Sequence, residues 1–319
     1  MGILNCCYSN DEYSDINGEK IYKLTKYAHS IIGGNSKIYR IKINQKLIVK
    51  RFNKSNKKMA LNEYVILKGL NESICHQFFP ILIKNEYHLG HYYLVMKDEK
   101  FYDLFSLYKR NITLNVPTVI NMFNQMLNGI LELNKLGISH LDIKPENIII
   151  KKISKKEAIM HNIQWDLNYV RKTMGIEYDG NDILYRVKII DLAGSKNQSE
   201  LKKVKNGKYD NFISTYGYTA PEYYLNSEIN NKFDVWSLGI ILWELLLGYT
   251  PFDSYTIDYI NEITNFDLFN PFIVYRTDIR KLNPMFVSIL KKMIEPNKDK
   301  RISIEELFNY KVFYKILKN

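Results

Sequence analysis

Residues 140 to 147 read His-Leu-Asp-Ile-Lys-Pro-Glu-Asn, and this octet is the most informative stretch of the chain. It places a carboxylate (Asp142), an ammonium group (Lys144) and a carboxamide (Asn147) close together in the sequence. The apolar residues that follow it, Ile148 to Ile150, are typical of a buried strand. A general base, a cation that neutralises phosphate and an oxygen ligand for a metal are what phosphoryl transfer to a hydroxyl requires.

The octet resembles the catalytic loop of the eukaryotic protein kinases, whose signature is His-Arg-Asp-x-x-x-x-Asn. One position differs, because Leu141 stands where the family usually has arginine. The resemblance covers about residues 22 to 317 and implies an α+β, bilobal kinase fold of the serine/threonine class. It implies a small β-rich lobe at about 21 to 98 and a larger helical lobe at about 99 to 317.

The same resemblance implies an activity and its cofactors. The expected reaction moves the γ-phosphoryl group of ATP, with Mg²⁺, to a serine or threonine hydroxyl of a protein substrate. Asp142 is expected to act as the catalytic base, and Lys144 is expected to contact the transferred phosphate.

The hydrophobic patterns before and after the octet predict two parts that differ in secondary structure. Before it, short apolar stretches predict strands with a helix between them, at about 46 to 52, 57 to 70 and 92 to 96. After Pro117, an amphipathic stripe predicts a long helix. The most apolar run, Leu238 to Leu247, is too short to span a bilayer and is interrupted by Glu244, so it predicts a buried helix.

Two further charged positions occur in the order that the family has them. Lys50, at the end of Leu-Ile-Val-Lys, matches the lysine that holds the α- and β-phosphates, and Glu63 matches its ion-pair partner. A surface ion pair worth ~0–1 kcal/mol is the alternative for these two residues. Asp191 begins Asp-Leu-Ala-Gly, which resembles the family's Asp-Phe-Gly. The resemblance implies that Asn147 and Asp191 bind magnesium, which prefers hard oxygen ligands.

The remaining nucleotide contacts are implied by position. The family's glycine loop aligns with the stretch from Ile31 to Ile38, in which Gly33 fits the pattern. Met96 is placed beside the adenine, although packing in the core explains it equally well. Asp103 matches the acid that contacts the ribose. The implied nucleotide-binding residues are Ile31, Gly33, Gly34, Ser36, Ile38, Lys50, Glu63, Met96 and Asp103.

The second half of the chain carries matches to the part of a kinase that docks peptides. Thr215 stands where serine/threonine kinases place a threonine that bonds the catalytic base. Glu222, in Ala-Pro-Glu, is expected to pair with Arg301. Asp234 is expected to support the catalytic loop, because a buried charge persists only when it is paired or hydrogen-bonded.

One segment, at about 151 to 184, is an insert relative to the family pattern, which joins Asn147 and Asp191 by a short hairpin. Loops longer than ~12–15 residues usually carry structure or function of their own. Apolar residues recur every three or four positions and predict a helix from about Lys155 to Met174. Its apolar face either packs on the large lobe or docks a partner.

Composition narrows the compartment and the partners. The chain has 319 residues, 46% of them hydrophobic, and a formal charge of +11. Lysine is spread along the chain with abundant asparagine and isoleucine, which indicates an AT-biased genome, so no nucleic-acid partner is expected. Three cysteines cannot form a disulfide framework, which favours a reducing, cytoplasmic compartment.

Residues 1 to 20 form a polar leader that begins Met-Gly-Ile-Leu-Asn-Cys-Cys. This start resembles an N-myristoylation site at Gly2 with palmitoylation cysteines at Cys6 and Cys7, although Cys6 stands where serine or threonine is usual. A chance Met-Gly start is the alternative. Because one myristoyl group anchors only weakly, both signals would be needed for association with a membrane surface.

Departures from the family pattern leave two rival functions. Leu141, Ala193 and the incomplete glycine loop would suit a pseudokinase that binds nucleotide and scaffolds partners. A small-molecule kinase of related fold is the other rival, although Thr215 and Asp234 favour a protein substrate. Without arginine at position 141, activity is expected to be independent of phosphorylation in the activation segment.

Overall fold

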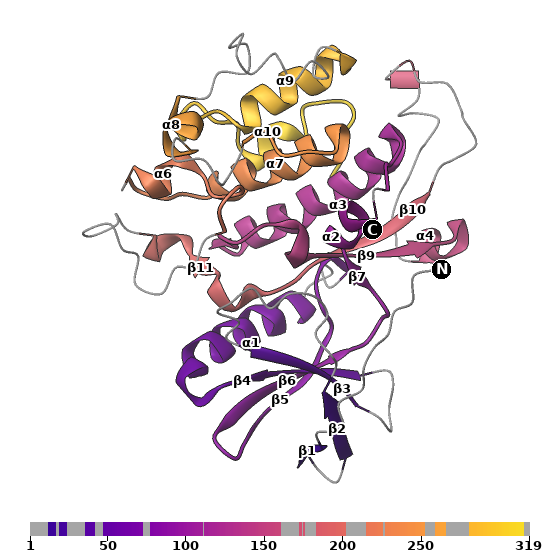
Figure 1. Cartoon of the computed structure of the whole chain (residues 1–319), viewed down its shortest axis with the longest axis vertical. Coiled ribbons are helices and arrows are strands. Elements are labelled where there is room, and N and C mark those ends of the chain that lie inside the picture. Colours follow the sequence, from indigo (N-terminus) through magenta and orange to yellow (C-terminus); the bar gives the residue numbers. More distant parts are fainter. Residues whose placement is uncertain are drawn as a thin grey trace. The chain divides into compact units, whose positions relative to one another are not determined.

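The computed structural model describes residues 12–16, 19–23, 36–41, 47–72, 77–110, 112–160, 172–173, 175, 183–201, 215–225, 227–252, 259–265 and 281–315 (Figure 1). The expected glycine-loop residues Ile31, Gly33 and Gly34, and the expected acylation sites Gly2, Cys6 and Cys7, lie outside this part of the chain. The chain divides into two compact units. The first contains residues 1–101 with 191–193, and the second contains 102–190 with 194–319.

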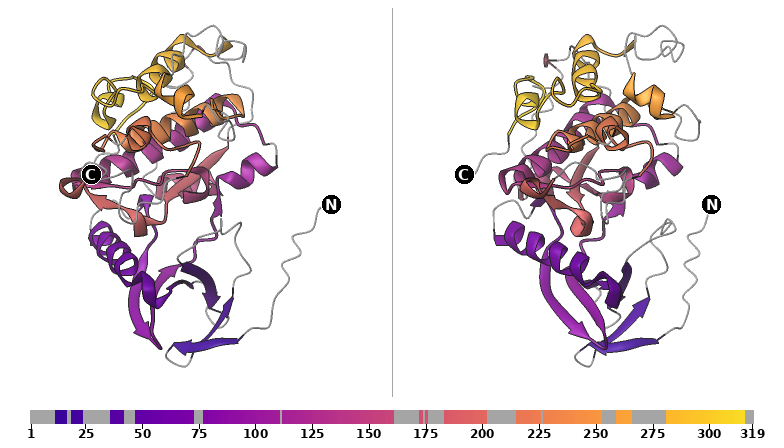
Figure 2. Two further views of the ribbon diagram at one scale, coloured as in Figure 1. Left: turned by 60° about the vertical axis from the view of Figure 1, so that its left-hand side comes forward. Right: turned by 90° about the vertical axis from the view of Figure 1, so that its left-hand side faces the viewer.

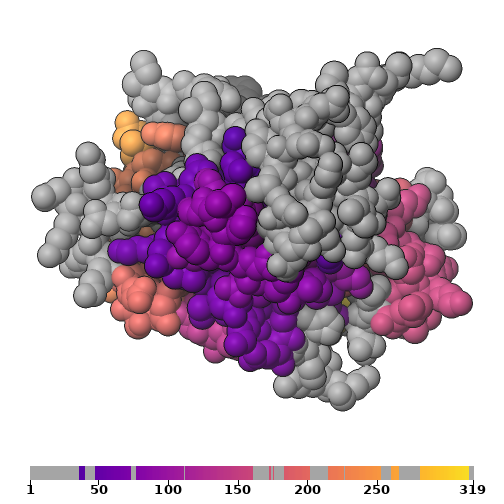
Figure 3. All heavy atoms as spheres, turned by 90° about the horizontal axis from the view of Figure 1, so that it is seen from below, coloured from indigo at the N-terminus to yellow at the C-terminus, as the bar shows by residue number. Residues whose placement is uncertain are grey.

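The first unit is built on one antiparallel sheet with the strand order β1-β2-β3-β4-β6-β5. Its elements are β1 (Glu12–Ile16), β2 (Glu19–Lys23), β3 (Ser36–Ile41), β4 (Leu47–Phe52), the 3₁₀ turn η1 (Lys54–Asn56), α1 (Lys57–Glu72), β5 (Leu82–His88) and β6 (His91–Lys97). Helix α1 packs against β5 and β6 (Figure 2), and Figure 3 shows part of the outer surface of these elements in indigo and violet.

Strand alternation in this sheet separates two apolar clusters. Tyr93 and Val95 belong to a cluster with Val49, whereas Leu94 belongs to the other, with Phe52. Since residues directly opposite each other share a face, the pairing of Lys50 with Leu94 puts Lys50 on the second face. The buried residues of α1 follow helical spacing and are Ala60, Glu63, Ile66, Leu67 and Leu70.

The second unit is mostly helical. Its elements are β7 (Tyr102–Asp103), α2 (Phe105–Lys109), α3 (Val116–Lys135), β8 (Ile138–Ser139), η3 (Pro145–Asn147), β9 (Ile148–Ile153), α4 (Lys155–Met160), β10 (Leu184–Ile189), η4 (Leu192–Gly194, shared with the first unit), β11 (Lys196–Asn197), η5 (Gln198–Glu200), α6 (Pro221–Tyr224), α7 (Phe233–Leu247), α8 (Tyr259–Thr264), α9 (Pro284–Met293) and α10 (Ile304–Leu307). The strands form a sheet ordered β10-β9-β7 and a pair of β11 with β8.

Helix α7 is the centre of this unit and packs against α3 and α9 (Figure 1). It is buried almost throughout, which explains its nearly uninterrupted apolar sequence. Gly239 allows the close approach to α9, because a Cβ there would lie 2.8 Å from Ile294 Cγ2. The helix ends at Gly248, whose φ of 81° is a common way to terminate a helix.

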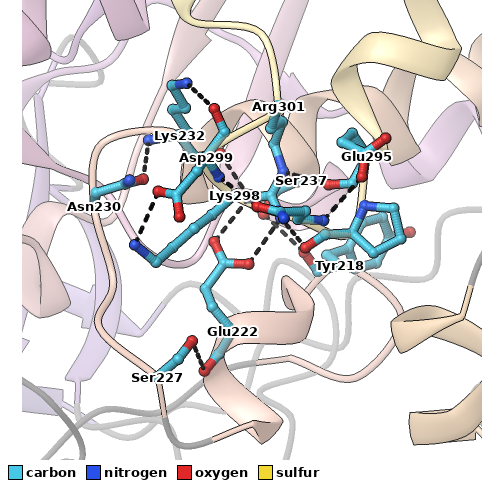
Figure 4. A network of polar contacts seen from close by, with 12 residues as sticks. Tyr218, Glu222, Ser227, Asn230, Lys232, Ser237, Glu295, Lys298, Asp299 and Arg301 are labelled. Carbon is cyan, nitrogen blue, oxygen red and sulfur yellow. Dashed lines mark hydrogen bonds and ion pairs between the residues drawn. The ribbon is translucent and has the colours of Figure 1, made fainter.

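A buried ion pair joins distant parts of this unit (Figure 4). Arg301 donates from Nη1 and Nη2 to the two carboxylate oxygens of Glu222 at 2.7 and 2.8 Å. The guanidinium also donates from Nε to the Glu295 carbonyl at 2.9 Å, and it lies over the ring of Trp236. The contact expected between Glu222 and Arg301 is confirmed.

The α+β fold class predicted from the sequence is confirmed, with an antiparallel sheet followed by a mostly helical region. The predicted helix at 57–70 is α1, and the buried helix at 238–247 lies within α7. The insert begins later than expected, because β9 continues to Ile153 and pairs with Leu184 of β10. Helix α4 is described to Met160, and most of the rest of the predicted insert helix lies outside the described residues.

Candidate active site

In the first unit, one lysine bridges two carboxylates. Lys50 Nζ lies 2.6 Å from Glu63 Oε2 and 2.7 Å from Asp191 Oδ1. The geometry follows from the elements, since Lys50 faces α1 and Glu63 lies within the buried stripe of that helix. The side chains of Lys50 and Glu63 are buried, whereas that of Asp191 is 45% exposed. The ion pair between Lys50 and Glu63 is therefore buried, and the alternative of a surface ion pair is wrong.

The charge state of this lysine follows from its neighbours. Burial by itself lowers the pKa of Lys50, but the charges of Asp191 and Glu63 outweigh it and hold the pKa above its usual value. The ammonium group is consequently protonated at neutral pH. A fixed cation beside a half-exposed carboxylate is chemically suited to a phosphate and its counter-cation.

The segment that begins at Asp191 is held by its backbone. Asn62 of α1 donates from Nδ2 to the carbonyl oxygens of Ala193 and Leu192, at 3.1 and 3.4 Å. Ala193 packs into the apolar cluster with Phe52, and so it fills a core position of the first unit. Asp191 itself has a φ of 65°, a conformation that an L-residue adopts at some energetic cost. Sequence reasoning missed Asn62, and only its place next to Glu63 could have indicated it.

In the second unit, Asp142, Lys144 and Thr215 form a closed triangle. Thr215 Oγ1 donates to Asp142 Oδ1 at 2.9 Å and accepts from Lys144 Nζ at 2.7 Å. Lys144 Nζ also lies 2.9 Å from Asp142 Oδ2. Each side chain is thus fixed by the other two, and the carboxylate and ammonium group are oriented together.

Asn147 completes this cluster. Its Nδ2 donates to the Asp142 carbonyl at 2.8 Å and to Asp142 Oδ2 at 3.0 Å. Because the amide nitrogen is used in this way, Oδ1 is the atom of Asn147 that can bind a cation. Its backbone carbonyl accepts from the Ile190 N–H at 2.9 Å, which ties the residue before Asp191 to the loop.

Asp234 binds the backbone of the loop that contains the octet, as predicted from the sequence. Its carboxylate accepts the backbone N–H groups of His140 and Leu141, both at 2.8 Å. Burial raises the pKa of Asp234, while the electrostatic interaction with His140 and these two N–H bonds act in the opposite direction. Leu141 has a φ of 70° and a buried side chain, so the position normally held by arginine contributes apolar packing instead.

The hydrogen bonds of His140 select one tautomer. Nε2 lies 2.9 Å from the Ile190 carbonyl oxygen, and Nδ1 lies 3.3 Å from the Asp142 backbone nitrogen. Both contacts are satisfied when Nε2 carries the hydrogen and Nδ1 accepts. His140 therefore links the Ile190 carbonyl to the backbone of Asp142.

The other predicted nucleotide contacts in the described part of the chain are Asp103, Met96, Ser36 and Ile38. Asp103 Oδ1 accepts from the backbone N–H and the hydroxyl of Ser106, both at 2.8 Å, and so stabilises the start of α2. Met96 is buried in the sheet of the first unit, Ser36 is half-buried, and Ile38 is exposed. The structure shows Asp103 bonded to Ser106 in the first turn of α2, and the ribose contact implied by the resemblance stays a prediction.

Near Glu146 of the octet lies a buried acid that sequence reasoning did not single out as functional. Glu244 of α7 accepts from the Tyr218 hydroxyl with both carboxylate oxygens, at 2.9 and 3.0 Å. Burial, reinforced by the neighbouring charge of Glu146, raises the pKa of Glu244 to about 8, although the bond from Tyr218 acts against this. In the sequence, the apolar run around Glu244 predicted a buried helix and no role for Glu244 itself.

Residues 32–313 match the family described as "Protein kinase domain", and the chain belongs to this family. It is 26% identical over 313 residues to serine/threonine-protein kinase cds1 of Schizosaccharomyces pombe, covering 94% of this chain and 57% of that protein. It is 28% identical over 281 residues to calcium-dependent protein kinase 4 of Plasmodium falciparum, covering 85% and 44%. It is 26% identical over 273 residues to serine/threonine-protein kinase unc-51 of Caenorhabditis elegans, covering 83% and 27%.

The chain thus spans less than two thirds of the length of these relatives. Among the described residues, no helix combines the length and the apolar character that crossing a membrane would need.

Proposed function

We propose that this chain is an ATP-dependent protein kinase that transfers the γ-phosphoryl group to a serine or threonine hydroxyl of a protein. The triangle of Asp142, Lys144 and Thr215 carries the proposal, because it orients a carboxylate and an ammonium group within hydrogen-bonding distance of each other. Phosphoryl transfer asks little covalent chemistry of the protein, so fixed placement of charges is the main requirement.

In this proposal Asp142 accepts or orients the proton of the attacking hydroxyl, and Lys144 neutralises charge on the transferred group. Thr215 holds both, which supports serine/threonine specificity. Two of the relatives are themselves named serine/threonine-protein kinases.

The nucleotide contacts are proposed residue by residue from the resemblance to the family. Lys50, kept in place by Glu63, would hold the α- and β-phosphates. The side-chain oxygens of Asn147 and Asp191 are hard ligands suited to Mg²⁺, which when bound would offset the charge of the phosphates. The glycine loop from Ile31 to Ile38 would cover the phosphates, and the remaining proposed contacts are Met96 and Asp103.

The test compares wild type with Asp191→Asn in a magnesium-ATP assay on a peptide library, followed by phosphoamino-acid analysis. The variant is expected to lose at least about 100-fold in turnover, since electrostatic stabilisation of this kind is typically worth that much. Asp299→Asn is the matched control, because it makes the same change at an exposed carboxylate.

Equal turnover by wild type and Asp191→Asn would reject catalysis by this site, and dominant phosphotyrosine would reject the specificity. A wild type that binds ATP without any turnover would favour the pseudokinase alternative, for which Leu141 and Ala193 are the specific observations.

We also propose that the N-terminus is acylated at Gly2, with Cys6 and Cys7 as the second signal, so that the kinase associates with a membrane surface. Labelling with a myristate analogue tests this proposal. Label on the wild type that is lost in Gly2→Ala is the expected result, and absence of label on both would end the idea.

A further inference from the structure

Strands β9 and β10 keep one pairing register over their full length, although no short turn connects them. The pairs run without a break from Ile153 with Leu184 to Ile148 with Ile189. In hairpins with loops of about two to five residues the turn fixes the register. Here residues 154–183 join the strands, so no such turn fixes the register. Ala158 of this connection packs with Ile153 and Leu184 at one end of the paired strands, and contacts from elsewhere in the chain hold the rest of β10.

The register matters because β10 leads through Ile190 directly to Asp191. A slip of one residue would turn every side chain of the strand to the opposite face. It would also displace Ile190, whose N–H donates to the Asn147 carbonyl at 2.9 Å and whose carbonyl oxygen lies 2.9 Å from His140 Nε2.

The free edge of β10 is bound by side chains of α3. β10 is the end strand of its sheet, and the N–H and C=O groups of alternate residues point away from β9. Gln125 Nε2 donates to the Tyr185 carbonyl at 2.7 Å, and Gln125 Oε1 accepts from the Val187 N–H at 3.0 Å. The carboxamide of Gln125 therefore takes the place of a neighbouring strand.

Gln125 is itself held in one orientation. It is 2% exposed, and its Nε2 also donates to Asn121 Oδ1, one helical turn earlier, at 2.9 Å. This second contact identifies Nε2 as the donor, which matches the carbonyl of Tyr185 on the strand. If the amide were reversed, Nε2 would face the Val187 N–H and Oε1 would face the Tyr185 carbonyl, and neither hydrogen bond could form.

A second side chain of α3 also binds this edge, at the residue directly before β10. Thr118 Oγ1 accepts from the Ile183 N–H at 3.2 Å. Gln125 lies seven residues after Thr118, which is a rise of ~10.5 Å along the helix. The strand rises ~7–13 Å from Ile183 to the groups of Tyr185 and Val187. In the observed register the spacing of Thr118 and Gln125 along the helix matches the spacing of their partners along the strand. A slip of two residues would move the strand by ~6.6 Å and carry these partners away from both side chains.

We propose that Gln125 is a positioning residue that sets the register of β10 in place of a short turn, and so presents Asp191 correctly. Its effect on turnover rests on the proposed kinase function, whereas its effect on the strand does not. A buried amide that merely contributes to packing is the alternative.

The experiment compares Gln125→Leu with Asn128→Leu in the full chain. Asn128 is a matched control, because it is a buried amide on the same helix whose Nδ2 donates to the Asn124 and Tyr314 carbonyls, at 2.8 and 3.1 Å. Amide hydrogen exchange at Val187 and the Mg²⁺ concentration that gives half-maximal turnover are measured for both.

Gln125→Leu is expected to speed exchange at Val187 at least about tenfold, because the hydrogen bond of that amide is lost. It should also raise the half-maximal Mg²⁺ concentration several-fold, while Asn128→Leu lowers the melting temperature and leaves both quantities unchanged. Equal effects of the two variants on these quantities would overturn the proposal.

Gln125→Glu separates the two bonds. Its ionised carboxylate can accept from the Val187 N–H but cannot donate to the Tyr185 carbonyl, whereas the protonated acid can do both, so a defect in the Mg²⁺ dependence that grows as the pH rises is expected. Unchanged Mg²⁺ dependence in this variant would contradict a need for both contacts.

A shortened chain provides the rescue. Replacing residues 154–183 by Asn-Gly joins the paired residues Ile153 and Leu184 with a two-residue hairpin turn, which fixes the register locally. In that background Gln125→Leu should change the Mg²⁺ dependence less than twofold, and an undiminished defect would overturn the proposal. If wild type had no turnover at all, the proposed function would fail, and exchange at Val187 would still decide the role of Gln125.

Discussion

Glu244 predicts a specific pH dependence of stability. Its pKa in the folded chain is about 8, compared with an ordinary value of 4.5 that the unfolded chain would show. Between these two pH values the folded state binds the proton and the unfolded state does not. The free energy of unfolding therefore falls as the pH rises through this window.

The size of the effect follows from the same two values. A difference of one pKa unit corresponds to ~1.36 kcal/mol, so complete titration of this buried group would remove roughly 5 kcal/mol as an upper limit. Glu244→Gln has no charge to bury and can still accept from the Tyr218 hydroxyl. We expect this variant to lose several kcal/mol less than wild type between pH 5 and pH 8.5.

Urea unfolding at pH 5, 6.5 and 8.5 measures the effect, and the difference between wild type and Glu244→Gln at each pH cancels the contribution of titrating groups that do not interact with Glu244. The difference should be smallest at pH 5 and should grow in favour of the variant as the pH rises. A difference that stays constant over this range would refute the protonation of Glu244 in the folded state.

Three further predictions concern packing, the buried ion pair and activation. Gly239→Ala should lower the free energy of unfolding by ~1–3 kcal/mol in urea titrations, because the new Cβ would lie 2.8 Å from Ile294 Cγ2; an unchanged midpoint would contradict this. Arg301→Met should cost ~3–5 kcal/mol by leaving the Glu222 carboxylate buried and unpaired, and adding Glu222→Leu should restore part of the loss in the same titrations. Since Leu141 cannot couple a phosphate to the loop, phosphatase treatment should leave turnover within about twofold; loss of nearly all turnover would reject this.

Local patterns were sufficient for much of the fold. The helical spacing that predicts α1 and the apolar run within α7 are properties of neighbouring residues, and both appear as expected. The contacts of Asp234 and Arg301 were also predicted, because the family motifs specify their partners. In these cases the sequence signal and the structural cause lie within one element or one motif.

The rest depends on contacts that no local pattern encodes. Gln125 binds a strand 60 residues away in sequence, and nothing distinguishes it from another glutamine on an amphipathic helix. Asn62 is recognised only once the backbone of Ala193 lies beside it. The pKa of Glu244 likewise depends on burial and on Glu146, which are properties of the folded chain.

The most direct test of the central claim is transfer of labelled γ-phosphoryl from ATP to serine and threonine peptides by wild type and Asp142→Asn. The proposal predicts label on serine or threonine with wild type, and at least about a hundredfold less with the variant, since a positioned base typically contributes that much. Equal incorporation by the two proteins would contradict the role of the octet at 140 to 147.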